Sequence, residues 1–138
     1  MKPREAFLSH SDQDRTFADR LAKTLVRHCI PVFYSRRHLR GAQQWHDEIG
    51  AALARCDWFL LVLSPRSVRS DWVKRELLYA LDSPAYQGHI VPILLRDCQP
   101  ERLSWTLGQF QRVDFKPGFD VGCRQLFRTW RMRYQPMV

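Results

Sequence analysis

Residues 58–63 are Trp58-Phe59-Leu60-Leu61-Val62-Leu63, an unbroken apolar run that Ser64-Pro65 brings to an end. A strand that is apolar at every position has no side suited to water, and this is typical of the centre of a parallel sheet. The run therefore predicts a central strand with a helix layer on each face. It is also far shorter than the roughly 20 residues of a membrane-spanning helix, so we expect no contact with a membrane.

Strands and helices alternate on both sides of this run. Before it, we expect a strand at residues 6–8 and a loop at 9–14. A helix follows, with Phe17, Leu21 and Leu25 in its apolar stripe and with Asp12 or Asp14 as its cap. Next come a strand at 29–34, a basic loop at 35–41 and a helix at 43–55. After it, we expect a helix at 70–81 capped by Ser70, a strand at 89–95, a weak helix at 101–107, a strand at 112–115 and a helix at 121–134.

The alternation predicts an α/β fold, with a parallel sheet and helices on both faces. The sequence contains no repeat, linker or low-complexity tract, so its 138 residues are expected to form a single domain, 1–138. In such folds, ligands bind at the carboxyl ends of the strands, where the strand order reverses. The loops to consider are therefore residues 9–14, 35–45 and 64–76.

The positive charge of the chain favours anionic partners but does not distinguish among them. Lys and Arg total 22 against 14 Asp and Glu, which gives a formal charge of +8. A field of that sign attracts nucleic acid, an acidic membrane surface or a phosphate-bearing small molecule. The four cysteines form no C-x-x-C pair, and the five histidines have no metal-ligand spacing. We therefore expect reduced thiols, a cytoplasmic location and no metal site.

The helix expected at 70–81 carries the most informative pair of residues. Val73 and Leu77 form its inward stripe, whereas Trp72 and Glu76 are four positions apart and share a different face. An aromatic face beside a carboxylate suits a cationic ring attached to a sugar, and Trp45 lies after a loop at the same edge of the sheet. The alternative is structural: Trp72 packs on a neighbouring helix, and Glu76 pairs with a nearby basic side chain.

Three motifs in order resemble those of Toll/interleukin-1 receptor (TIR) domains. Ala6-Phe7-Leu8-Ser9-His10-Ser11-Asp12-Gln13-Asp14 is similar to the family's first strand and loop. The run 58–65 followed by Ser70-x-Trp72-x-x-x-Glu76-Leu77 resembles its third strand and third helix. Residues 35–45 resemble its BB loop, with Gly41 and a following aromatic, Trp45. The resemblance covers residues 4 to 134.

This resemblance implies a flavodoxin-like sheet of five parallel strands. For many members of the family it also implies cleavage of NAD+ at the nicotinamide–ribose bond, with NAD+ as substrate and no further cofactor. Glu76 would be catalytic, Trp72 would lie near the nicotinamide, and Ser9, His10 and the loop ending at Trp45 would line the substrate cleft. Such members act in immune signalling, often antiphage defence, and they self-associate to complete the site.

The sequence departs from the family pattern at one place, and two other functions are alternatives to NAD+ cleavage. The BB loop is basic here, and Arg40 stands where the family usually has proline, so Arg36 and Arg37 could bind a pyrophosphate, bind an acidic partner or be solvated. A TIR domain that only binds other TIR domains, as a non-catalytic scaffold, is the main alternative. Nucleic-acid binding ranks last, because the arginines are scattered. From the chain length we also expect a separate sensor or effector partner.

Overall fold

The chain forms one five-stranded sheet. A computed structural model describes residues 1–34 and 42–137, with the backbone alone for residues 42–45. The sheet order is β2-β1-β3-β4-β5, and every neighbouring pair is parallel. This order confirms the flavodoxin-like α/β fold. The strands are β1 (Ala6–Ser9), β2 (Val32–Tyr34), β3 (Trp58–Leu63), β4 (Ile90–Leu94) and β5 (Val113–Asp114).

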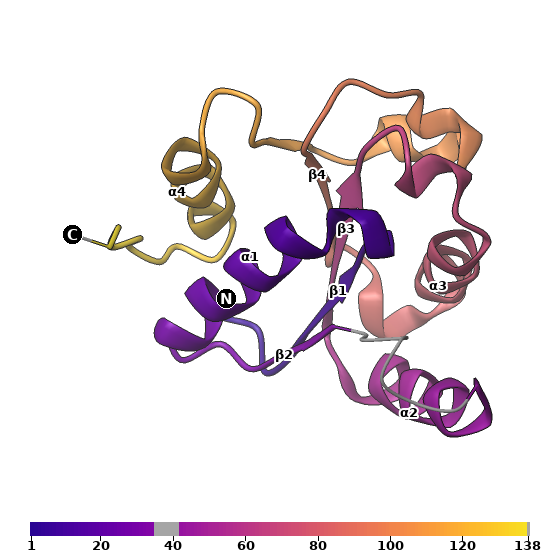
Figure 1. The fold of residues 1–138 in the computed structure, drawn as a ribbon. Helices are drawn as coiled ribbons and strands as arrows, with labels where there is room; N and C mark the ends of the chain where they lie inside the picture. The colour runs from indigo at the N-terminus through magenta and orange to yellow at the C-terminus, as the bar shows by residue number, and fades with distance from the viewer. Residues whose placement is uncertain (35–41, 138) are drawn as a thin grey trace.

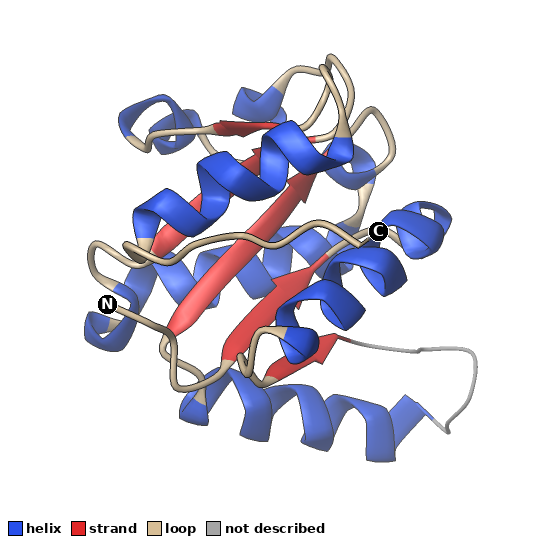
Figure 2. Cartoon of the chain, turned by 90° about the vertical axis from the view of Figure 1, so that its left-hand side faces the viewer, coloured by secondary structure: helices blue, strands red, loops and turns tan. Residues whose placement is uncertain are grey.

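Helices cover both faces of the sheet, as the apolar central run predicts. The helices are α1 (Arg15–Arg27), α2 (Ala42–Arg55), α3 (Asp71–Asp82) and α4 (Phe119–Thr129). Figure 1 shows α1 and α4 on one face and α2 and α3 on the other. Figure 2 shows the strands side by side between these layers. None of the helices in the described part of the chain is both long and apolar enough to cross a membrane.

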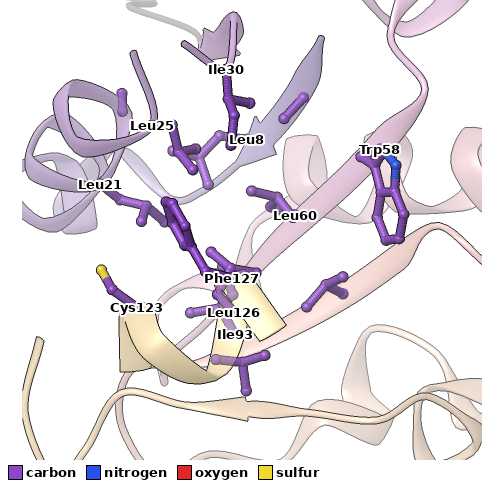
Figure 3. Close-up of a cluster of buried hydrophobic side chains, with 14 of the residues drawn as sticks. Leu8, Leu21, Leu25, Ile30, Trp58, Leu60, Ile93, Cys123, Leu126 and Phe127 are labelled. Carbon is purple, nitrogen blue, oxygen red and sulfur yellow. The ribbon is translucent and has the colours of Figure 1, made fainter. Parts of the chain in front are cut away.

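Alternation along β3 divides the apolar core into two layers. Leu60 points toward α1 and α4, where Leu25 and Phe127 pack against it in one buried cluster (Figure 3). Leu61 points the other way, into a second buried cluster that contains Leu77 of α3. All five side chains are fully buried. Complete burial of a large apolar side chain contributes roughly 1.5–3 kcal/mol, so the two layers together hold the helices against the sheet.

The start of β2 and the end of α4 differ from the predicted bounds. The N–H of Cys29 bonds to the carbonyl of Val26, and the N–H of Ile30 bonds to that of Leu25, both at 2.9 Å. This pattern is a Schellman motif, in which the residue after the helix takes a left-handed conformation. Cys29 has φ +63°, so β2 begins at Val32 and not at residue 29.

The same motif ends α4. Arg131 has φ +57°, and the N–H of Met132 bonds to the carbonyl of Phe127 at 3.0 Å. The helix therefore ends at Thr129 and not at residue 134. Glycine, the usual signal for this motif, is absent from both sites, so the sequence did not reveal either helix end.

Other boundaries shift by smaller amounts. Ser70 caps α3 as predicted, because its side chain accepts from the N–H of Val73 at 3.2 Å. Asp14 occupies the cap position of α1, as predicted, but its side chain makes no capping bond. The weak helix expected at 101–107 is two 3-10 helices, η5 (Pro100–Arg102) and η6 (Trp105–Gln109).

Candidate functional site

The candidate site lies at the carboxyl ends of β1 and β3. β1 has β2 on one side and β3 on the other, so the chain leaves β1 in one direction and returns across it in the other. In doubly wound folds, ligands bind beyond the carboxyl ends of the strands at such a reversal of strand order. The segments that follow β1 and β3 both supply polar side chains to this edge.

Ser9 and Glu76 meet at this edge. Ser9 is the last residue of β1 and alternates with Phe7, so it points toward α3. Its Oγ donates a hydrogen bond to Glu76 Oε1 at 2.6 Å. Ser9 is 1% exposed and Glu76 is 2% exposed. Glu76 thus lies at the margin between α3 and the sheet, not on the open helix face that its spacing suggested.

A second serine–carboxylate pair lies on the other side of the same edge. Ser64 follows β3 and alternates with Leu60 and Val62, which places it toward α1. Its Oγ donates a short hydrogen bond of 2.5 Å to Asp14 Oδ2, and both residues are buried. The sequence analysis missed this pair. The available signal was that both residues belong to loops that follow buried strands.

Ser67 forms hydrogen bonds with Ser64. The N–H of Ser64 donates to Ser67 Oγ at 2.9 Å, and the N–H of Ser67 donates to Ser64 Oγ at 3.1 Å. These reciprocal bonds hold the hydroxyl of Ser64 toward Asp14. The start of α1 is therefore tied to the end of β3, next to the loop that carries His10.

Two of the predicted aromatic residues, His10 and Trp72, lie close in the chain to Ser9 and Glu76. His10 is buried, and the centroid of its ring is 6.1 Å from that of Tyr34 at the end of β2. Trp72 is half-buried on α3, one turn before Glu76, and its ring centroid is 6.0 Å from that of His46. The guanidinium of Arg75 lies 5.3 Å from the Trp72 ring centroid, within the range of a cation–π contact.

The structure therefore brings Ser9 and Glu76 into direct contact, with His10 next to Ser9 in the chain and Trp72 one turn before Glu76. The side chain of Trp45 and the loop at residues 35–41, with Arg36, lie outside the described residues. Among the residues that are described, no group of three or more His, Cys, Asp or Glu side chains could hold a metal ion.

The chemistry available at this edge follows from the buried carboxylate. A carboxylate that is held in place and shielded from water stabilises positive charge that develops beside it. The donor from Ser9 fixes one oxygen of Glu76, so the group needs little reorganisation when a cation forms. The indole of Trp72, one turn away, offers an apolar surface to a flat ring.

Comparison with known proteins gives the family. Residues 6–127 match the family model described as TIR domain. No curated protein matches the chain. The TIR domain of the Toll-related receptor TRR-2 from Hydra magnipapillata is 23% identical with a TM-score of 0.71, over 92% of this chain and 98% of that one.

Two further solved structures are similar. A prokaryotic SEFIR domain is 13% identical with a TM-score of 0.68, over 94% of this chain and 99% of that one. The TIR domains of the activated Roq1 resistosome, which directly recognises the pathogen effector XopQ, are 16% identical with a TM-score of 0.66, over 93% of this chain and 99% of that one. At these identities the structural likeness establishes the fold alone.

Proposed function

The chain belongs to the TIR domain family, and on that basis we propose that it cleaves NAD+ at the nicotinamide–ribose bond, with Glu76 as the catalytic carboxylate. The observation that supports the proposal most is the buried hydrogen bond from Ser9 to Glu76, 2.6 Å long, at the carboxyl edge of the sheet. Doubly wound folds bind nucleotides at this edge. A buried carboxylate there serves a reaction that develops positive charge.

The reaction begins when the bond between the ribose carbon and the nicotinamide nitrogen breaks. The electron pair of that bond goes to the nitrogen, so nicotinamide leaves as a neutral molecule and needs no proton. The ribose carbon becomes an oxocarbenium-like cation, which Glu76 stabilises through its negative charge. Water then adds to this carbon and releases a proton, which gives ADP-ribose. Attack by an adenine nitrogen or a ribose hydroxyl instead gives a cyclic nucleotide.

The other residues of the site bind the substrate. Trp72 stacks with the nicotinamide ring, whose positive charge is attracted to an aromatic face. Ser9 orients Glu76, and His10 lines the cleft. NAD+ is the substrate, and the proposed mechanism needs no further cofactor.

Access to Glu76 links the activity to assembly. Because Glu76 is 2% exposed, NAD+ can reach it only after neighbouring side chains shift. Self-association through contacts between TIR domains, triggered by a separate sensor or effector protein, supplies the energy for that shift. The similar Roq1 structure is that of an activated resistosome. We place this chain in cytoplasmic immune signalling of the same broad kind, antiphage defence included.

The burial of Glu76 also favours a second function. A serine–glutamate bond between β1 and α3 stabilises the fold whether or not a substrate binds. The chain would then be a scaffold that only binds other TIR domains. Nicotinamide release distinguishes the two functions, because a scaffold produces none even when it is fully assembled.

The test is chromatography of nucleotides after incubation of the protein with NAD+, at low and high protein concentration and with a crowding agent. We expect nicotinamide to appear at high concentration. We expect Glu76→Gln, which keeps an acceptor for Ser9, to lose turnover by at least about a hundredfold, as is typical for loss of an electrostatic stabiliser. Asp82→Asn, an exposed site at the end of the same helix, is the matched control and should keep turnover. Assembled protein that releases no nicotinamide, or active Glu76→Gln, would refute the proposal.

A further inference from the structure

A cavity of about 510 Å3 lies at the edge of the sheet opposite the Ser9–Glu76 pair. Its walls come from the amino ends of β3 and β4, the segment that leads into β5 and the last turn of α4. Sites for small molecules are typically about 300–1,000 Å3 in volume. The cavity therefore has room for a ligand the size of a nucleotide, and it is separate from the candidate NAD+ site.

One wall of the cavity is apolar and rigid. Trp58, Val91 and Val113 line it from one face of the sheet, and all three are mostly buried. The indole of Trp58 is stacked on His89, with ring centroids 4.1 Å apart and an angle of 3° between the rings. Side chains fixed in this way contact a flat heterocycle at little cost in conformational entropy.

The rim of the cavity is positively charged. Arg112 and Arg128 line it and are exposed. Neither forms a salt bridge with any residue that the structure describes. The described lining includes no Asp or Glu. Two guanidinium groups around one opening, with no carboxylate among the described walls, suit an anion, and arginine matches the geometry of phosphate.

The side chain of Gln125 links α4, which carries Arg128, to the backbone at Arg112. Its Nε2 donates to the backbone carbonyl of Arg112 at 3.3 Å, and its Oε1 accepts from the N–H of Asp114 at 3.0 Å. Gln125 is three residues before Arg128 on α4, so the two share a helix face. The amide therefore ties the backbone of Arg112 to the helix that carries Arg128, and both arginines line the same opening.

We propose that this cavity binds an organic phosphate the size of a nucleoside monophosphate. The phosphate lies between Arg112 and Arg128, and the ring lies against Trp58, Val91 and Val113. The side chains of Gln109 and Gln111, which also line the cavity, supply amide groups for the polar edge of the ring. The site does not depend on Glu76, so it does not depend on the proposed NAD+ cleavage.

The test is a titration of the whole chain with adenosine 5′-monophosphate, followed by backbone amide signals in 1H–15N correlation spectra. The signals of Ile90, Val113 and Thr129 should move. Arg112→Gln and Arg128→Gln should each weaken binding by about tenfold or more, the loss expected for a hydrogen bond to a charged group. Arg102→Gln, an exposed site on η5, removes the same charge and should bind as the native chain does. Shifts confined to Ser9 and Trp72, or no shift at millimolar ligand, would overturn the proposal.

Three further measurements sharpen this result. Inorganic phosphate and adenosine should each bind more weakly than the nucleotide, because each fills only one half of the cavity. Inorganic phosphate that binds as tightly as the nucleotide would remove the role of the apolar wall and overturn the assignment. Glu76→Gln should keep the shifts at Ile90 and Val113, so failure of the NAD+ reaction and failure of this site are told apart.

Discussion

Ser9 Oγ donates a hydrogen bond to Glu76 Oε1 across 2.6 Å, between residues that are 67 positions apart in the chain. The bond joins the last residue of the first strand to the middle of α3. Because of this bond, Glu76 is part of the packing of the fold as well as the proposed catalytic group. The effects of substituting Glu76 on stability and on turnover are therefore measured separately.

The serine–glutamate bond should be measurable in stability. Ser9→Ala removes a donor from a buried carboxylate, and we expect the free energy of unfolding to fall by about 1–3 kcal/mol. Urea denaturation measures this change. In a double-mutant cycle with Glu76→Ala, which removes the acceptor, the coupling energy should be about 0.5 kcal/mol or more, because the two side chains are in direct contact. Additive effects of the two substitutions would contradict the bond.

The second serine–carboxylate pair should behave in the same way. Ser64→Ala removes the hydroxyl that donates to Asp14 and leaves a buried carboxylate short of one donor, so we expect a loss of about 1–3 kcal/mol in the free energy of unfolding. The control is Ser83→Ala at the end of α3, because Ser83 makes no capping bond, and its effect should stay within about 0.5 kcal/mol. Equal effects at the two serines in urea denaturation would argue against the pair.

Two helical glycines should respond to alanine in opposite directions. A Cβ at Gly122 of α4 would lie 2.3 Å from Cγ of the Phe115 ring, whereas a Cβ at Gly50 of α2 meets nothing within 4 Å. Gly122→Ala should therefore lower the free energy of unfolding by about 1–3 kcal/mol through overpacking. Gly50→Ala should raise it by roughly 0.5–1 kcal/mol. Thermal or urea denaturation checks both, and a stabilising Gly122→Ala would contradict the close packing on Phe115.

The left-handed residue after α4 offers a gain in stability. Arg131 has φ +57°, a conformation that costs a side-chain-bearing residue roughly 1–2 kcal/mol. Arg131→Gly should relieve most of that strain and raise the melting temperature. Arg131→Ala, which also removes the charge but keeps a Cβ, is the control and should show no comparable gain. A lower melting temperature for Arg131→Gly than for Arg131→Ala would show that the residue is not left-handed.

The buried thiol of Cys56 predicts a loss of stability in alkali. Burial is the main cause that raises the pKa of Cys56 from 9.0 to about 12. The folded state therefore holds this proton more tightly than the unfolded state does. The resulting stabilisation is complete below about pH 9, and it is lost as the pH rises toward 12.

Urea denaturation between pH 8 and pH 10.5 tests this effect. The free energy of unfolding should fall with pH over this range, and the slope should be smaller in Cys56→Ala, which has no thiol to ionise at this position. The comparison is made on slopes, because the substitution itself changes the stability at every pH. An equally steep slope in Cys56→Ala would contradict the prediction.

The sequence predicted the regular elements wherever the signal was local. The apolar run from Trp58 to Leu63 is β3 with the predicted bounds, and Ser70 caps α3. The start of β2 and the end of α4 were missed because Cys29 and Arg131, not glycine, occupy the left-handed positions. Those residues take that conformation because the Schellman hydrogen bonds and the packing of the following residues offset its cost.

The candidate site was only partly predictable. The spacing within α3 places Trp72 and Glu76 on one side of the helix, and the resemblance to TIR domains pointed to Ser9 and His10. Nothing local indicated that Ser9 would bind Glu76 or that Ser64 would bind Asp14. Both bonds depend on which strands become neighbours.

By itself, then, the order of apolar and polar residues determined the α/β class and the elements that carry the polar loops, because helix and strand periodicities arise from residues a few positions apart. Tertiary structure alone decided that Glu76 is buried against Ser9 and that Arg112 and Arg128 share one opening. The physical reason is that these contacts form only once β1 lies between β2 and β3 and α4 packs beside β5. That arrangement is set by the joint burial of both faces of the sheet.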